Sequence, residues 1–249
     1  MDTEIDSTDT STGRQDTYHF SITPTNVPKI DTKYRKIVTS IPPENSIPIL
    51  NELRKYEPES MSLELPVVWD RAEDFQVFDE NGNCWIDFCA GTFVTNTGHR
   101  NPKICNAISE IVNNNFLHNY YFPSKIRAKL VKKLHDMTAV NLEKVFLLTT
   151  GAETIECCIK LARIYGRKIN PKKIGIVSFV GAMHGKTLGA LMVGGKTKEK
   201  HWIANHDPDM HHLPFPKDSS DDKVFHNHMK QLEQSGVDLS TIAAFMVES

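Results

Sequence analysis

The sequence predicts an α/β fold, and two features of its second half lead to this prediction. Short apolar runs at 145–148, 174–179 and 242–247 have the length and composition of buried strands. Between these runs, at 150–168 and around 225–232, apolar residues recur with helical spacing. Strands that alternate with helices of this length favour a largely parallel or mixed sheet with helices packed on it.

The overall composition argues against several classes of protein. The 249 residues carry 29 Lys and Arg against 31 Asp and Glu, a net charge of −2 that gives no footprint for nucleic acid. No run approaches the roughly 18 apolar residues of a membrane span, and the acidic N-terminus lacks the features of a secretory signal. Five cysteines without a C-x-x-C pair indicate reduced thiols. We therefore expect a cytoplasmic protein without nucleic-acid or membrane partners.

The first hundred residues predict a tail followed by a segment with a hairpin. Residues 1–34 are polar with little apolar periodicity, which indicates a disordered or extended tail. Residues 35–100 begin with an irregular, proline-rich lead-in that contains a short helix near Ile49 to Leu53. Asn81 and Gly82 then separate two apolar-aromatic runs, a strong hairpin signal, because both residue types tolerate a positive φ. The small and hydroxyl residues of 90–102 predict a loop.

Residues 101–249 are expected to form the larger domain. Pro102 opens a helix with Ile104 and Ile108 on its apolar face, and a second helix at 124–137 has a lysine-rich, solvated face. The stretch 194–222 is predicted to be a long loop. Its histidines fit no standard zinc spacing, so we interpret them as solvated and expect no metal site. These histidines are His201, His206, His211 and His212.

The octapeptide TTGAETIE, 149–156, lies between a predicted strand and a predicted helix. The first backbone N–H groups of a helix lack partners within the helix, and the helix dipole adds positive potential there, so a phosphate is stabilised without a lysine. Thr150 and Glu153 also have the spacing of a capping box, which needs no ligand. The two interpretations are compatible, and both stay open at this point.

A second turn, GAMHGKT at 181–187, follows the next predicted strand. Gly181 and Gly185 bracket Met183 and His184, and residues displayed in this way could cover a flat ligand. The simpler interpretation is a tight turn with a surface histidine. This stretch taken alone does not decide between them.

Taken together, the motifs resemble the class III pyridoxal-phosphate aminotransferases, which are fold-type I enzymes. VFDENGNCWIDFCAG is similar to the family's hairpin before the substrate loop, and TNTGHRNPKICNAI to its Gly-His-x-x-Pro segment. FLLTTGAETIECCIKLAR resembles the phosphate-cup motif, FVGAMHGKTLGAL the cofactor-stacking turn, and AFMVES the start of the next motif. The resemblance covers roughly residues 45–249. It implies an incomplete three-layer α/β/α large domain that binds pyridoxal 5'-phosphate, with an N-terminal segment of the small domain.

The resemblance implies roles for the residues at matching positions. Gly151 and Ala152 would offer backbone N–H groups to the cofactor phosphate, with Thr150 beside them. Met183 stands where the family usually has an aromatic residue on the pyridine ring, and its polarisable sulfur can pack there. The other implied positions are His184, Gly185 and Glu248 on the cofactor side, and Thr92 and Phe93 in the substrate-side loop.

Two roles of the family have no matching residue in this chain. The aspartate that pairs with the pyridinium nitrogen and the lysine that forms the internal aldimine follow later motifs, beyond Ser249. Lys186 stands where the family often has Arg, and we do not assign it the aldimine role. We therefore assign no catalytic residue and expect an N-terminal portion that is inactive alone.

The implied function of the full-length form is transfer of an amino group between an amine or amino acid and an oxo acid, by a homodimer. Two alternatives stay open. One is another reaction on the same scaffold, by an aminomutase, decarboxylase, racemase or amine lyase. The other is a non-catalytic subunit that binds the cofactor or forms dimers.

Overall fold

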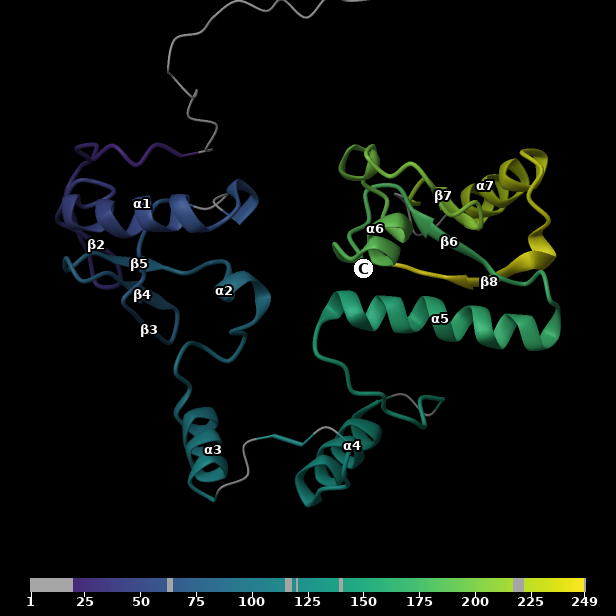
Figure 1. Ribbon diagram of the computed structural model, residues 1–249, viewed down its shortest axis with the longest axis horizontal. Coiled ribbons are helices and arrows are strands. Elements are labelled where there is room, and N and C mark those ends of the chain that lie inside the picture. The colour runs from purple at the N-terminus through teal and green to yellow at the C-terminus, as the bar shows by residue number, and fades with distance from the viewer. Residues whose placement is uncertain are drawn as a thin grey trace, which may run out of the picture. The chain divides into compact units, whose positions relative to one another are not determined.

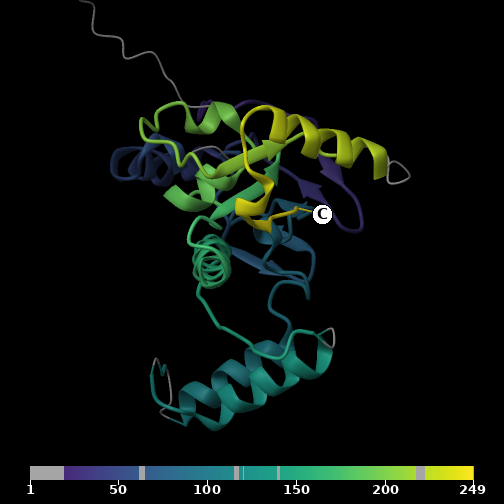
Figure 2. The same ribbon diagram turned by 90° about the vertical axis from the view of Figure 1, so that its right-hand side faces the viewer.

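The computed structural model describes residues 20–61, 65–114, 118–119, 121–138, 141–216 and 222–248. The chain divides into two compact units, Met1–Phe122 and Pro123–Ser249, whose elements are labelled in Figure 1 and seen from a second side in Figure 2. The helix that begins at Pro102 falls in the first unit, although the sequence led us to expect it in the larger domain.

An antiparallel five-stranded sheet organises the first unit, in the order β1-β2-β5-β4-β3 (Figure 1). Its strands are β1 (Ile30–Asp31), β2 (Lys36–Ile37), β3 (Arg71–Glu73), β4 (Gln76–Phe78) and β5 (Cys84–Ile86). Strand β1 lies in the stretch that we predicted to be a disordered or extended tail; residues 30–31 are extended and pair with β2. The rest of that tail, residues 1–19, lies outside the described residues.

Strands β4 and β5 form the predicted hairpin, with Val77 opposite Trp85. Of the Asn81-Gly82 pair, Gly82 has the positive φ, 84°. A carboxylate shapes the rest of the turn, because Asp79 Oδ1 accepts the N–H groups of Asn81 at 2.9 Å and of Asn83 at 2.8 Å. The sequence thus predicted the hairpin. Its turn is shaped by the positive φ of Gly82 together with the Asp79 carboxylate.

The helices of the first unit are α1 (Ile47–Tyr56), α2 (Ala90–Phe93) and α3 (Pro102–Asn113), with 3-10 turns η1 (Glu44–Ser46) and η2 (Glu59–Met61). Helices α1 and α3 confirm the helices predicted near Ile49 to Leu53 and from Pro102. The predicted loop 90–102 begins instead with α2, a single left-handed turn in which Ala90, Gly91, Thr92 and Phe93 all have positive φ. The Val94 N–H closes this turn on the Ala90 carbonyl at 2.9 Å.

The second unit is built on a three-stranded parallel sheet in the order β7-β6-β8 (Figure 1). Its strands are β6 (Gly175–Phe179), β7 (Met210–Leu213) and β8 (Ile242–Phe245). Its helices are α4 (Lys125–Met137), α5 (Gly151–Ile169), α6 (Leu188–Val193) and α7 (Asp222–Gln234), with 3-10 turns η3 (Thr197–Lys200) and η4 (Leu239–Thr241). In the described ranges, no helix is long and apolar enough to cross a membrane.

All five residues of β6 are buried. Since successive side chains point to opposite sides of a strand, both faces of β6 are covered. Val177 and Phe179 pack against α7, whose contributing side chains include Phe225. Ile176, on the other face, packs against α5 and against Val193 of α6. Helices therefore cover both faces of the sheet, and the second unit has the predicted α/β/α layering.

Two predictions about secondary structure in the second unit are wrong. The apolar run 145–148 is not a strand: no neighbouring strand pairs with it among the described residues, and the Phe146 side chain is 69% exposed. Strand geometry needs such a neighbour for its backbone donors and acceptors. The predicted loop 194–222 contains β7, where His211 and His212 pair with Val177 and Ser178 of β6.

Candidate active site

The start of α5 carries the capping box that its sequence predicted. Thr150 Oγ1 accepts the Glu153 N–H at 3.2 Å, and Glu153 Oε2 accepts the N–H groups of Thr149 and Thr150, both at 3.1 Å. These bonds satisfy the amide of the capping residue and that of the third helical residue. The amides of Gly151 and Ala152 remain, and no acceptor for either is found in the described part of the chain.

The space in front of these two amides suits an anion. A Cβ atom built on Gly151 would meet no heavy atom within 4 Å. The 19 residues of α5 direct the positive end of the helix dipole to the same place. Two free N–H groups, open space and a favourable dipole are what a phosphate needs, so the residues present fit the phosphate of the implied cofactor.

The turn after β6 meets this helix start directly. A Cβ on Gly185 would lie 2.8 Å from the Ala152 Cβ and 3.0 Å from its Cα, and the φ of Gly185 is +129°. A side chain at Gly185 would therefore push the turn away from α5. The structure thus brings together the two glycine-containing motifs of the sequence, through the contact between Gly185 and Ala152.

The adjacent glycines Gly194 and Gly195, which belong to no motif identified in the sequence, support this turn through backbone hydrogen bonds. The Gly181 N–H donates to the Gly195 carbonyl at 3.1 Å, and the Gly195 N–H donates to the Ala182 carbonyl at 2.8 Å. A Cβ on Gly195 would overlap the Phe179 carbonyl oxygen and the Gly181 nitrogen. The adjacent Gly194 and Gly195 in the sequence were the available signal, since a glycine pair often marks close backbone approach.

The three remaining cofactor-side residues lie on or beside the same turn. The Met183 N–H donates to Glu248 Oε2 at 2.6 Å, so the carboxylate of the predicted glutamate contacts the backbone of the turn. His184 is 7% exposed, and its Nε2 atom has no hydrogen-bond partner among the residues that the structure describes. Burial lowers the pKa of His184, although the charge of Glu248 opposes this effect. A neutral, buried His184 corrects the simpler interpretation of a surface histidine.

The histidines of 194–222 do not behave as one group. His212 Nε2 lies 2.9 Å from the Gly194 carbonyl oxygen and 3.1 Å from Lys200 Nζ, so it belongs to the packing of β7 and not to a solvated loop. His201 and His206 are exposed. Within the described ranges, no three His, Cys, Asp or Glu side chains come close enough to hold a metal ion.

The predicted substrate-side residues lie in the first unit, in the left-handed turn α2. Thr92 is exposed, and the Phe93 side chain is 83% exposed. The carboxylate of Asp87 supports the turn by accepting the Gly91 N–H at 2.8 Å and by contacting His99 Nε2 at 2.7 Å. Thr92 and Phe93 border a cavity of about 800 Å³, whose lining also includes Trp69, Trp85, Asp87 and Phe88.

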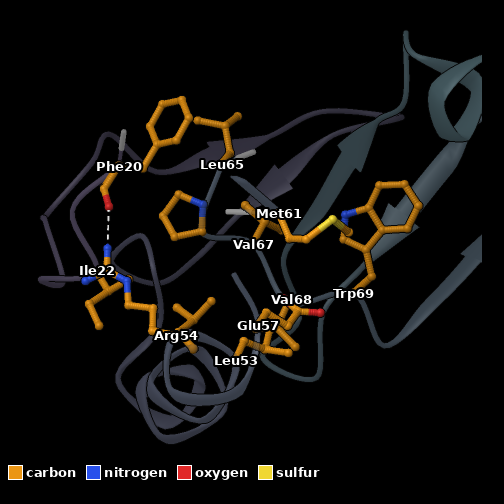
Figure 3. Close-up of a pocket in the computed structure, with 12 residues that line it drawn as sticks. Phe20, Ile22, Leu53, Arg54, Glu57, Met61, Leu65, Val67, Val68 and Trp69 are labelled. Carbon is orange, nitrogen blue, oxygen red and sulfur yellow. Dashed lines mark hydrogen bonds between the residues drawn. The ribbon is translucent and has the colours of Figure 1, made fainter. Parts of the chain in front are cut away.

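Figure 3 shows a second, smaller cavity of the first unit, of about 270 Å³, which no motif of the sequence predicted. Leu53, Met61, Val67 and other apolar side chains form most of its wall. Arg54 Nη2 donates to the Phe20 carbonyl at 2.7 Å, the bond drawn in Figure 3, and so ties the first described residue to α1.

Comparison with known proteins supports the interpretation of the motifs. Residues 58–249 match the family described as aminotransferase class-III. The acetylornithine aminotransferase of Agrobacterium fabrum is 36% identical over 134 residues, 53% of this chain and 33% of that protein. The succinylornithine transaminase of Salmonella paratyphi B is 34% identical over 151 residues, 60% of this chain and 36% of that protein. This chain thus spans about a third of the length of these relatives.

Solved structures give the same result for the fold. A transaminase from Virgibacillus superimposes with a TM-score of 0.71 at 20% identity, over 80% of this chain and 47% of that one. The taurine:2-oxoglutarate aminotransferase of Bifidobacterium kashiwanohense, solved with PLP and glutamate, gives 0.68 at 23% identity, over 82% and 48%. The ornithine aminotransferase of Toxoplasma gondii gives 0.68 at 21% identity, over 83% and 46%. These likenesses confirm the predicted fold class.

Proposed function

Because this chain belongs to the class III aminotransferase family, we propose that its full-length form binds pyridoxal 5'-phosphate and transfers an amino group between an amine or amino acid and an oxo acid. The observation that carries the proposal is the start of α5, where the amides of Gly151 and Ala152 find no acceptor within the described part of the chain and the space beside Gly151 is open. A phosphate there would accept both N–H groups and would lie at the positive end of the helix dipole.

Each residue near this start has a role in the proposal. Gly151 and Ala152 bind the phosphate through their backbones, and Thr150 holds the helix start in place by its cap. Met183 packs beside the ring, and Glu248 keeps Met183 in position by accepting its N–H. Pyridoxal phosphate, when bound, supplies an electron sink for bond cleavage at the amine-bearing carbon of the substrate.

Buried His184 and glycine Gly185 complete the proposed site. The lowered pKa of His184 keeps its ring neutral near pH 7, so this buried residue adds no positive charge to the proposed site. Gly185 lets the turn approach Ala152 so closely that no water fits between Gly185 and the start of α5.

The substrate is proposed as a class only. The relatives named for acetylornithine and succinylornithine, and the structure named for taurine, suggest an amine or amino acid together with an oxo acid. Thr92 and Phe93 are proposed to border this substrate, in a cytoplasmic homodimer of the full-length form. Residues 1–249 alone are proposed to be inactive, since no position that matches a family motif supplies the aldimine lysine.

Binding of pyridoxamine 5'-phosphate tests the cofactor site, because this compound needs no lysine to bind. We expect saturable binding to the 249-residue chain by equilibrium dialysis, competition by inorganic phosphate, and affinity about ten- to hundredfold weaker for pyridoxamine, which lacks the charged acceptor. Gly151→Asp places a carboxylate against the site and is expected to abolish the preference for the phosphate ester. Gly236→Asp adds the same charge at another open glycine, outside the site and at a φ of +98° that strains the backbone locally, and is expected to leave the preference unchanged.

Equal affinities for pyridoxamine and its phosphate would contradict the proposed phosphate site. Amino transfer by residues 1–249 with pyridoxal phosphate, an amino acid and an oxo acid, measured as formation of the new amino acid, would contradict the proposed inactivity. The two results are separate, because the first concerns binding and the second concerns turnover.

A further inference from the structure

The short helix α6 lies between the two glycine-containing segments of the candidate site. It follows the turn at Gly181 to Gly185 and precedes Gly194 and Gly195, which support that turn. With six residues it is well below the length at which a helix is stable by itself. Something outside the helix must hold it in place, and charged side chains contact both of its ends.

The carboxylate of Glu156, on α5, caps the N-terminal end of α6. Its Oε1 atom accepts the Thr187 hydroxyl at 2.6 Å, the Gly189 N–H at 2.9 Å and the Ala190 N–H at 3.1 Å. A Cβ on Gly189 would overlap this carboxylate. Thr187, the capping residue by position, makes no side-chain cap of its own. A negative charge at this end also matches the sign of the helix dipole.

The ammonium of Lys200, in η3, contacts the C-terminal end of α6. Its Nζ atom donates to the Met192 carbonyl at 3.0 Å and to the Gly194 carbonyl at 2.6 Å. Lys200 is only 6% exposed, and His212 Nε2 lies 3.1 Å from Nζ. A positive charge suits this end of the helix, where carbonyl groups lack partners. The two ends of α6 are thus held by charges of opposite and matching sign.

Both contacts lead back to the candidate phosphate site. Glu156 belongs to the same helix as Gly151 and Ala152, so its bonds fasten the start of α6 to α5. Lys200 holds Gly194, whose neighbour Gly195 exchanges backbone hydrogen bonds with the turn. In the chain, Gly185 lies between Gly181 and Ala182, which bond to Gly195, and Thr187, which bonds to Glu156. It is the residue of this stretch that approaches Ala152. Displacement of α6 would therefore move the turn relative to the start of α5.

We propose that Glu156 and Lys200 are positioning residues that hold α6 at its two ends and so set the turn Gly181–Gly185 against Ala152 before any ligand binds. The consequence for ligand affinity rests on the proposed function, whereas the positioning itself does not. In this role Glu156 and Lys200 act on the site through α6 and the turn, without touching the ligand.

Hydrogen exchange of the unliganded chain, measured by mass spectrometry, tests the positioning. We expect Glu156→Ala and Lys200→Met to speed exchange about tenfold or more in two places, α6 and the turn Met183–Gly185, since each change removes hydrogen bonds to a charged group. Glu156→Gln keeps an acceptor and loses the charge, so it is expected to recover part of the protection. Glu233→Gln and Lys198→Met, at exposed positions, are the matched controls and are expected to change exchange less than twofold.

Dialysis with pyridoxamine 5'-phosphate then tests the consequence. We expect affinity to fall about tenfold in Glu156→Ala, to recover partly in Glu156→Gln, and to be unchanged in the two controls. Unchanged exchange in α6 would overturn the proposal, and so would faster exchange in α6 with an unchanged turn. Faster exchange spread evenly over the second unit, in Glu156→Gln as well, would also overturn it. If the parent chain binds no ligand, the proposed function fails, and the exchange results alone decide the positioning.

Discussion

Two loop segments that each carry some of the predicted site residues are held by different forces. Residues 179–195 follow β6 and are held by burial and by close backbone approach, with Gly185 against Ala152 and Gly195 against Phe179. Residues 87–99 follow β5 and are shaped by the carboxylate of Asp87, which accepts the N–H groups of Cys89 and Gly91 and contacts His99. Backbone bonds between Asp74 and His99 fix the end of this segment. Apart from the contacts of Glu156 and Lys200 with α6, the first segment depends on two positions without a side chain, Gly185 and Gly195, and the start of the second depends on one carboxylate.

Because of this difference, the two segments tolerate different amino-acid substitutions. Close packing leaves no room for added atoms at Gly185 and Gly195, so substitutions that enlarge these two residues are costly. The polar segment also includes the left-handed turn α2, in which Ala90, Thr92 and Phe93 adopt a conformation that L-residues disfavour by roughly 1–2 kcal/mol each. Backbone strain of this kind occurs at functional sites more often than elsewhere. Its presence next to Thr92 and Phe93 supports their proposed substrate-side role.

The largest expected effect is that of Gly185→Ala. The new Cβ would lie within 3.0 Å of Ala152 at a φ that disfavours side chains, so we expect the free energy of unfolding to fall by about 3 kcal/mol. Gly151→Ala is the matched control: its Cβ would meet nothing, and we expect a change within about 0.5 kcal/mol. Urea titration of both variants checks the difference, and equal losses would show that close approach does not hold 179–195.

The next effect is that of Asp87→Asn in the other segment. One oxygen of the carboxylate is replaced by a donor, which would face either the N–H of Cys89 or both the His99 ring and the N–H of Gly91, so we expect a loss of about 2 kcal/mol. The exposed pair of Lys132 and Asp136 supplies the control, and Asp136→Asn is expected to cost less than about 0.5 kcal/mol. Hydrogen exchange localises the damage. Exchange that rises in 179–195 and not in 87–99 would contradict the division drawn here.

Acid is expected to affect the two segments at different pH values. Burial lowers the pKa of His184 and, together with the charge of Lys200, that of His212. Below the ordinary histidine pKa of about 6.5 the unfolded chain therefore binds more protons than the folded chain, and stability falls as pH falls. Burial alone would raise the pKa of Asp87, but its hydrogen bonds with His99 and the backbone outweigh burial and lower it.

The contribution of Asp87 is thus present above the ordinary aspartate pKa of about 3.9 and is lost only as pH falls through its lower folded value. Between pH 7 and 5 we expect faster hydrogen exchange in 179–195, after correction for the intrinsic rate, and little change in 87–99. The slope is at most about 1.4 kcal/mol per pH unit for each extra proton bound by the unfolded chain. His212→Asn is expected to flatten it, and an equal response of both segments would contradict the assignment.

The smallest expected effect is a gain in stability. Thr92 has φ +63°, a strained value for a β-branched residue, so Thr92→Gly is expected to raise the free energy of unfolding by about 0.5 kcal/mol after the greater freedom of unfolded glycine is counted. Thr92→Ala keeps the Cβ and is the control, with a smaller gain. Thermal unfolding measures both. A loss in Thr92→Gly would mean that the Thr92 side chain stabilises the turn more than its strain costs.

The sequence by itself determined the features that depend on neighbouring residues. The capping box of Thr150 and Glu153, the buried strand β6 and the hairpin around Gly82 all formed where the pattern predicted them. Each is decided within one turn or one strand by side-chain chemistry, backbone preference and alternation. The family resemblance rests on these same local motifs, which is why it could be recognised before the fold was known.

Tertiary structure alone decided the features that need a distant partner. The run 145–148 has the composition of a strand but finds no neighbour to pair with among the described residues, whereas the histidine-rich residues of β7 become a strand beside β6. No local sequence pattern predicts that Gly185 lies against Ala152, or that Glu156 and Lys200 bind the two ends of α6. The Glu156 contacts join residues 31 to 34 positions apart, and Lys200 meets carbonyls 6 and 8 positions away that no regular helix or strand would bring to it. The energies of these contacts exist only once folding has brought both partners together.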